Sequence, residues 1–165
     1  MLYLGVDPGS EGAVACLSPG YDSDHSHVEF FDTPTASDGS RRRYLLAEMN
    51  DFLRRHSLNG HCQAAVESIF SLPQQGPRQA FAMGQGLMAW EALLTANGIS
   101  YTLVTPQRWK KAMLLGIGSD KEASRLRAQQ LFPTAVAWLN LKKHHNRAEA
   151  ALMAEWLRQQ SRESK

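Results

Sequence analysis

Residues 2–17 read LYLGVDPGSEGAVACL, two apolar runs around a turn. Residues 2–6 form the short, continuous apolar run typical of a buried β-strand, and Asp7 follows them directly. Residues 8–12 contain Pro, two Gly and Ser, which predict a turn. Residues 13–17 predict a second strand. The chain is therefore expected to begin with two neighbouring strands and to carry a carboxylate where the first strand meets the turn.

Further short apolar runs predict three more strands, and longer runs with helical spacing predict five helices. The expected strands are residues 2–6, 13–17, 28–31, 63–67 and 100–104. The expected helices are 41–56, 79–96 (ended by Gly98), one beginning at Thr105-Pro106, one from a Ser119/Glu122 capping box through Phe132, and one from His144 or His145 to Gln160. Residues 33–40 and 68–78 are expected to be loops.

The order of these elements predicts an α/β fold with a five-stranded mixed sheet flanked by helices. Three strands form a meander and two are added through helical crossovers. No repeat or long flexible linker divides the chain, so we expect one domain over residues 1–165. No apolar run approaches the ~18–20 residues of a membrane helix, which predicts a soluble protein. Cys16 and Cys62 are too few for a disulfide framework and are expected to be buried thiols.

Charge is unevenly distributed along the chain. Residues 1–100 contain 6 Arg and Lys against 11 Asp and Glu, whereas residues 101–165 contain 12 against 5. This bias has two interpretations. It reflects solvated helix faces, or it marks a basic surface for a polyanion on the C-terminal side.

Asp7 and Glu67 each stand at the end of a predicted strand. An Asp beside Gly and Pro often only caps its own turn, and a functional carboxylate is the alternative. If the two strands are adjacent and parallel, both carboxylates lie at one edge of the sheet. Their repulsion would then be relieved by a shared cation.

A third group of candidates lies in residues 142–152, KKHHNRAEAAL. His145 and Glu149 are four residues apart and share one helical face, although surface helices carry such pairs by chance. The neighbouring Lys142, Lys143 and Arg147 would suit a metal site beside a phosphate backbone. Hard ligands holding Mg²⁺ can ionise a water and stabilise both oxygens of an in-line displacement.

These segments together resemble the RuvC-type Holliday-junction resolvases of the ribonuclease-H-like superfamily. The resemblance rests on Val6-Asp7-Pro8-Gly9, Glu67-Ser68-Ile69-Phe70, Gly116-Ile117-Gly118-Ser119 and His145…Glu149, and extends over residues 4 to about 156. It is nearest to the chloroplast (monokaryotic) branch, whose final helix carries a similar Leu-Lys-Lys-His-His-x-Arg-Ala-Glu-Ala run.

The resemblance implies a ribonuclease-H-like fold with four catalytic and metal-binding positions. These are Asp7, Glu67, His145 and Glu149. RuvC-type enzymes commonly have an Asp three residues before the last carboxylate, where this chain has Asn146. We therefore assign the ligand to His145, as in the chloroplast branch, with His144 as the competing candidate.

Several residues are candidates for DNA contact. Phe70 corresponds to an aromatic residue that in the family inserts at the junction crossover, although a lone Phe is more often part of the core. Gln74, Gln75 and Arg78 lie in the same predicted loop. Basic residues that could contact the backbone, any one of which could simply be solvated, are Arg108, Lys110, Lys111, Lys121, Lys142, Lys143 and Arg147.

The helix at 79–96 contains small residues on one side, among them Ala80 and Gly84, with Ala82 and Gly86 nearby. Glycine weakens a helix by about 1 kcal/mol, so close approach of another backbone is expected there. That backbone belongs to this protein's own sheet or to a second copy. The resemblance implies a homodimer, which fits a junction of near two-fold symmetry.

The function expected from these observations is a metal-dependent, structure-selective endonuclease that makes paired symmetric nicks in four-way DNA junctions. Two Mg²⁺ ions, replaceable by Mn²⁺, are the expected cofactors. The alternatives are a ribonuclease that cuts RNA–DNA hybrids and a non-catalytic junction-binding protein; an actin-like ATPase would need two large domains. We expect the cytoplasm of a bacterial or phage-infected cell, or an organellar stroma or matrix after removal of a transit peptide.

Overall fold

The computed structural model describes residues 1–18, 27–39, 41–58, 61–68 and 76–163. The strands are β1 (Leu2–Val6), β2 (Ala13–Ser18), β3 (His27–Asp32), β4 (Thr35–Asp38), β5 (Arg41–Tyr44), β6 (Cys62–Glu67) and β7 (Ser100–Val104). The α-helices are α1 (Leu46–Ser57), α2 (Pro77–Ala96), α3 (Pro106–Met113), α4 (Lys121–Leu131) and α5 (His145–Glu163). Two short 3₁₀ segments, Pro133–Trp138 and Lys142–His144, lead from α4 to α5.

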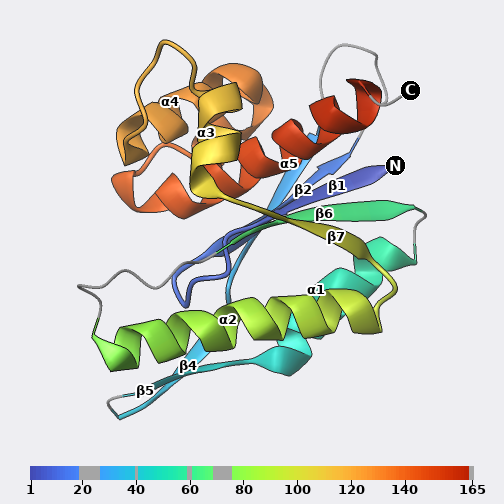
Figure 1. The fold of residues 1–165 in the computed structure, drawn as a ribbon, viewed down its shortest axis with the longest axis vertical. Helices are drawn as coiled ribbons and strands as arrows, with labels where there is room; N and C mark the ends of the chain where they lie inside the picture. Colours follow the sequence, from blue (N-terminus) through green and yellow to red (C-terminus); the bar gives the residue numbers. More distant parts are fainter. Residues whose placement is uncertain (19–26, 40, 59–60, 69–75, 164–165) are drawn as a thin grey trace.

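The predicted five-stranded mixed sheet is confirmed, with strand order β3-β2-β1-β6-β7 (Figure 1). The first three strands form an antiparallel meander, and β6 and β7 run parallel to β1. In the register of β1 and β6, Val6 lies opposite Val66. The residues that follow these two valines, Asp7 and Glu67, therefore emerge at the same edge of the sheet.

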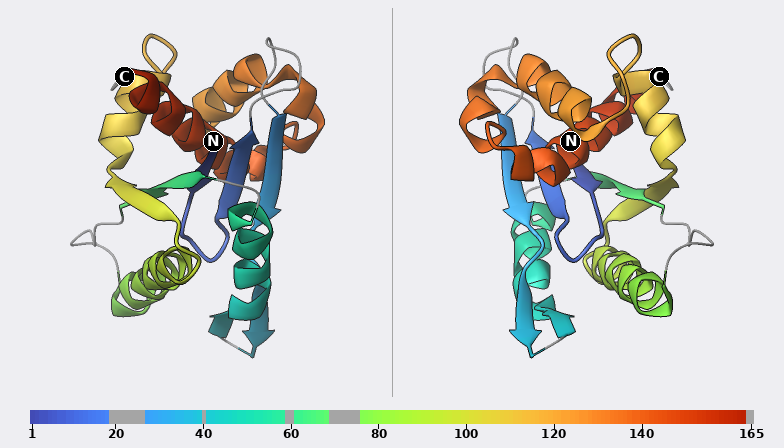
Figure 2. Two further views of the ribbon diagram at one scale, coloured as in Figure 1. Left: turned by 90° about the vertical axis from the view of Figure 1, so that its right-hand side faces the viewer. Right: turned by 90° about the vertical axis from the view of Figure 1, so that its left-hand side faces the viewer.

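Helices cover both faces of the sheet, so that the molecule has three layers (Figures 1 and 2). On one face α5 crosses β1 and β2, and α3 and α4 pack against α5. Gly5 explains how closely α5 approaches: a Cβ at this position would lie 1.9 Å from the carbonyl oxygen of Ala150. Burial of the apolar face of α5 and of its alanines fixes this helix on the strand that leads to Asp7.

Helices α1 and α2 cover the other face, where Phe52, Trp90 and Leu94 are fully buried. The two glycines of α2 differ in their surroundings. A Cβ on Gly86 would lie 2.1 Å from the carbonyl oxygen of Pro8, whereas a Cβ on Gly84 would meet nothing within 4 Å. Helix α2 therefore touches the turn that follows Asp7 through Gly86.

The region between β3 and α1 differs from the sequence-based prediction. Residues 33–40 were expected to be a loop and residues 41–56 a helix, but β4 and β5 pair as a separate antiparallel hairpin and α1 begins only at Leu46. Asp38-Gly39 is a typical hairpin signal, and Gly39 has φ 62°. Pairing of the two short strands outweighs the helical spacing of the apolar residues.

The expected start of α4 was also wrong in detail. Its N-cap is Asp120, whose side chain accepts a hydrogen bond of 2.7 Å from the backbone N–H of Ala123, so the proposed Ser119/Glu122 capping box does not form. The Thr105 cap of α3 and the end of α2 before Gly98, at φ 66°, are confirmed.

Both cysteines are free; Cys16 is buried, as expected, and Cys62 is half-buried. None of the helices in the described part of the chain is long and apolar enough to cross a bilayer.

Candidate active site

Asp7 and Glu67 lie at the carboxyl ends of adjacent parallel strands, which is the condition under which the sequence analysis expects the two carboxylates to meet. Oδ1 of Asp7 accepts a hydrogen bond of 3.2 Å from the backbone N–H of Gly9, so the turn orients this carboxylate. Burial, reinforced by the charge of Glu149, raises the pKa of Asp7 to about 6. Burial and the negative charge of Glu149 therefore both disfavour the ionised form of Asp7.

Glu67 is oriented by Trp109, a fully buried residue of α3. The indole N–H of Trp109 donates a hydrogen bond of 2.9 Å to Oε1 of Glu67. Burial raises the pKa of Glu67 to about 7, the indole lowers it, and the charges of Asp7 and Glu149 raise it further. The mutual effects on pKa place all three carboxylates in one electrostatic cluster.

Glu149 joins this cluster from α5 and is only 8% exposed. Its Oε1 lies 2.8 Å from Nζ of Lys110 and accepts a hydrogen bond of 3.3 Å from Oγ of Ser124. The positive charge of Lys110 also lowers the pKa of Asp7 and of Glu67. One ammonium group therefore partly neutralises three carboxylates.

His145 lies one helical turn before Glu149 and is paired with a second lysine. Its Nε2 is 2.8 Å from Nζ of Lys121, and its Nδ1 is 3.1 Å from the carbonyl oxygen of Lys142. A charged ammonium group can only donate and a carbonyl can only accept. The contacts therefore favour the tautomer with the proton on Nδ1, which leaves the lone pair of Nε2 in the state that binds a metal.

The four predicted ligands do not form a ready-made metal site. Within the described ranges, no three His, Cys, Asp or Glu side chains are close enough together to hold an ion. Lys110 and Lys121 instead provide the positive charge, at Glu149 and His145. The donors nevertheless fit a hard divalent cation, because they are carboxylate oxygens plus one imidazole nitrogen whose lone pair now accepts a hydrogen bond from Lys121.

The neighbours of His145 have other contacts. Nδ1 of His144 accepts a hydrogen bond of 3.4 Å from the backbone N–H of Leu141, and burial together with Arg147 and Lys143 lowers the pKa of His144. The side-chain amide of Asn146 donates to the carbonyl oxygen of Glu11. Asn146 thus ties the start of α5 to the turn after Asp7.

The predicted DNA-contacting residues have different surroundings. Phe70, Gln74 and Gln75 lie outside the described residues. Lys110 is paired with Glu149, and Arg147 is held by Asp32, to which its Nε donates at 2.6 Å. Arg108 is exposed, and its guanidinium lies 5.3 Å from the ring centre of Trp156. The other exposed members are Arg78, Lys111, Lys121, Lys142 and Lys143.

Sequence reasoning missed Trp109 and Ser124 as partners of the carboxylates. Trp109 lies in an amphipathic segment beside Lys110, where a tryptophan is expected in the core. Only the packing of α3 against the sheet reveals its hydrogen bond. Ser124 gives no signal in the sequence, since its role depends on α4 lying against α5.

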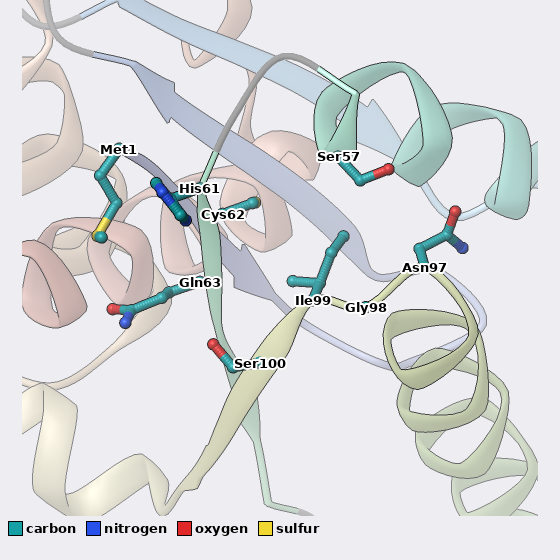
Figure 3. Close-up of a pocket in the computed structure, with 9 residues that line it drawn as sticks. All are labelled: Met1, Ser57, His61, Cys62, Gln63, Asn97, Gly98, Ile99 and Ser100. Carbon is teal, nitrogen blue, oxygen red and sulfur yellow. The ribbon is translucent and has the colours of Figure 1, made fainter.

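A separate cavity of about 230 Å³ lies at the opposite ends of these strands. Residues from the end of α1, the start of β6 and the turn between α2 and β7 line it. Figure 3 shows Ser57 and Asn97 on one side of β6, and Met1 and Gln63 on the other. The cavity does not adjoin the carboxylate cluster.

Comparison with known proteins supports the resemblance stated above. No family model matches the chain. Over 85 residues it is 35% identical to the chloroplastic Holliday junction resolvase MOC1 of Chlamydomonas reinhardtii; the match covers 52% of this chain and 10% of that protein. The chain thus spans only a small part of that relative's length.

Solved structures extend the likeness to nearly the whole chain. The chain matches T. thermophilus RuvC in complex with a Holliday junction substrate at a TM-score of 0.61 and 20% identity, over 93% of this chain and 90% of that one. A second Thermus thermophilus RuvC structure matches at a TM-score of 0.55 and 19% identity, over 93% and 91%. The predicted fold is therefore confirmed: the chain has the ribonuclease-H-like fold of RuvC.

Proposed function

We propose that this protein is a Holliday-junction resolvase, a metal-dependent endonuclease that makes paired symmetric nicks in four-way DNA junctions. The observation that carries the proposal is the electrostatic cluster of Asp7, Glu67 and Glu149, with Lys110 inside it. Carboxylates that are buried close together repel one another and destabilise the folded protein unless a cation offsets their charge. Such a cluster therefore indicates a functional cation site. The similarity of the fold to that of RuvC, and the 35% sequence identity over 85 residues to a chloroplastic Holliday junction resolvase, support the choice of DNA substrate.

Asp7, Glu67, His145 and Glu149 are the residues that would hold the ions, which we propose to be two Mg²⁺, with Mn²⁺ as a substitute. Such ions activate a water and stabilise the attacking and leaving oxygens of an in-line displacement. Trp109 keeps Glu67 oriented, and the Gly9 amide keeps Asp7 oriented. The expected products are 5′-phosphate and 3′-hydroxyl ends that can be ligated.

Lys110 and Lys121 have a second role in this proposal. Their ammonium groups stabilise Glu149 and His145 while no divalent cation is bound. With divalent cations held by the carboxylates, Lys110 and Lys121 would no longer be needed for that charge and could pair with phosphate oxygens of the DNA. The site thereby exchanges pairing within the protein for pairing with substrate.

We further propose that the protein acts as a homodimer through α2, because paired nicks require two active sites. Trp90 and Leu94 of α2 are buried against the protein's own sheet, whereas Phe81 and Met88 are 68% and 63% exposed. Leu46 of α1, 51% exposed, borders the same groove as these two side chains. A second copy would cover this apolar surface.

The cellular compartment, a bacterial or phage-infected cytoplasm or an organellar stroma or matrix, stays a prediction.

The test uses an immobile four-way DNA junction, a linear duplex and an RNA–DNA hybrid, each incubated with protein and Mg²⁺ or Mn²⁺. We expect symmetric nicks in the junction alone. Glu149→Gln should reduce the cleavage rate by more than about a hundredfold, because it removes a proposed metal ligand. Glu163→Gln, the same change near the exposed end of α5, is the matched control and should cleave normally.

Other outcomes would change the proposal. Cleavage of the hybrid alone would identify a ribonuclease. A junction that is bound but left whole with both metals would identify a binding protein without catalysis. Equal cleavage by wild type and Glu149→Gln would remove Glu149 from the site.

A further inference from the structure

A second cavity, of about 250 Å³, opens to the surface and is lined by segments far apart in the sequence. These are the turn after Asp7, the end of β3, the β4–β5 hairpin and the start of α5. The cavity shares two elements with the candidate active site, because the 8–12 turn follows Asp7 and α5 carries His145 and Glu149. Its charged lining residues are the basic Arg42, Lys143 and Arg147 and the acidic Glu11 and Asp32.

The basic groups around this cavity differ in how firmly they are held. Nε of Arg147 donates to Asp32 at 2.6 Å, and Nη1 donates to the carbonyl oxygen of Trp138 at 3.3 Å. The guanidinium of Arg147 is therefore already held by contacts within the protein. Arg42 is paired with Glu11 at 2.9 Å, but the two side chains are 51% and 73% exposed. Such an exposed pair is weak and can be replaced by another anion.

Lys143 adds a further positive charge at the rim of the cavity, where its side chain is exposed. Arg42 reaches the cavity from the hairpin and Lys143 from the segment before α5. Two cations on separate elements thus face one cavity. This arrangement suits a multiply accepting anion better than a single carboxylate.

We infer that this cavity binds a phosphate group of the DNA backbone, held by Arg42 and Lys143. The inference rests on the proposed function and adds a contact that neither the fold nor the carboxylate cluster assigns. The hairpin of β4 and β5 is then part of the DNA-binding surface.

The first experiment measures binding of a fluorescent four-way junction in EDTA, so that the DNA stays whole, over a range of salt concentrations. Arg42→Gln and Lys143→Gln should each weaken binding about tenfold, as expected for a charge-assisted contact. Each should also reduce the slope of log Kd against log salt by about one. Arg54→Gln, an exposed arginine of α1 outside the cavity, is the matched control and should bind as wild type does.

A second arm locates the phosphate. Single phosphates flanking the cleavage site are replaced in turn by neutral methylphosphonates. At one position the change should weaken binding by wild type but not by Arg42→Gln, because the contact is already lost in that variant.

The outcomes separate this inference from the proposed function. Wild-type affinity in Arg42→Gln and Lys143→Gln, or an equal loss in Arg54→Gln, would overturn the phosphate site while leaving the resolvase proposal intact. Weakened binding in the two variants, with no junction cleavage by wild type in Mg²⁺ or Mn²⁺, would support the site and overturn the catalytic proposal. Absence of DNA binding by the wild type would overturn both.

Discussion

Glu67 receives its orientation from a residue whose main role is packing. Trp109 is fully buried in the core, yet its indole N–H reaches a carboxylate at the edge of the sheet. The same hydrogen bond lowers the pKa of Glu67 against the effect of burial. A core side chain therefore favours the ionised form of a proposed metal ligand, against the larger effect of burial.

Trp109→Phe should shift the pH dependence of cleavage. Without the indole N–H, less stabilises the ionised form of Glu67, so its pKa rises and the acidic limb of the pH–rate profile moves to higher pH. The profile should be measured at fixed Mg²⁺ under single-turnover conditions. A uniformly lower rate with an unmoved limb would mean that Trp109 acts only through packing.

The raised pKa values of Asp7 and Glu67 also predict how stability depends on pH without metal. In the folded protein the pKa of Asp7 is about 6 and that of Glu67 about 7, above their ordinary values of 3.8 and 4.5, so protonation favours the folded state. The free energy of unfolding should therefore fall as pH rises from about 4 to about 7. Asp7→Asn should be more stable than wild type by roughly 2–3 kcal/mol at about pH 8, and nearly equal to it at about pH 4.

Urea unfolding in the presence of a chelator measures this difference. A constant difference between Asp7→Asn and wild type across the pH range would show that ionisation of Asp7 is not the cause. Addition of Mg²⁺ should narrow the gap at high pH, because the cation stabilises the ionised carboxylates of the wild type.

At the level of elements, the sequence predicted the main sheet because its strands are short, apolar and bounded by turn residues. The end of β1 at Asp7 and of β6 at Glu67 came from the same pattern. The hairpin of β4 and β5 escaped prediction because Arg41–Tyr44 has no alternation of apolar and polar residues. The pairing of β4 with β5 depends on the Asp38-Gly39 turn and on contacts between the two strands. The helical spacing of the apolar residues that follow favoured a helix from residue 41 instead.

The candidate site was predictable only in part. Carboxylates at strand ends and a His four residues before a Glu are visible in the sequence. The pairing of Lys110 with Glu149 and of Lys121 with His145 depends on how α3 and α4 pack beside α5. No local pattern encodes that packing.

The two glycines of α2 provide a matched pair of substitutions. Gly84→Ala enters open space and should stabilise the protein by about 0.5–1 kcal/mol through helix propensity. Gly86→Ala would force a Cβ to 2.1 Å from the Pro8 carbonyl oxygen and 2.3 Å from the Tyr44 hydroxyl, and should destabilise by about 2 kcal/mol or more.

Thermal or urea unfolding of both variants checks this prediction. Because Pro8 follows Asp7, Gly86→Ala should also lower the cleavage rate. Equal stability of the two variants would mean that α2 moves away from the turn at little cost.

At the scale of the whole molecule, the proposed dimer connects paired nicking to α2. Met88→Glu places a charge in the exposed apolar surface and should shift the protein to a monomer in sedimentation velocity experiments. The monomer should remain folded, since Met88 is 63% exposed. It should release far fewer products that require two coordinated cuts, while single nicks remain detectable.

A wild-type monomer at micromolar concentration, both free and on the junction, would contradict this prediction. Unchanged sedimentation of Met88→Glu with an intact wild-type dimer would place the interface elsewhere.

The contact between Gly5 and Ala150 has a consequence for how the catalytic machinery tolerates change. The strand that precedes Asp7 and the helix that bears Glu149 contact each other there through backbone atoms, with no side chain between them. Their separation is thus set by peptide atoms, which do not repack as side chains do. Even one added methyl group at position 5 would act as a spacer and change the distance between two proposed ligands that it never touches.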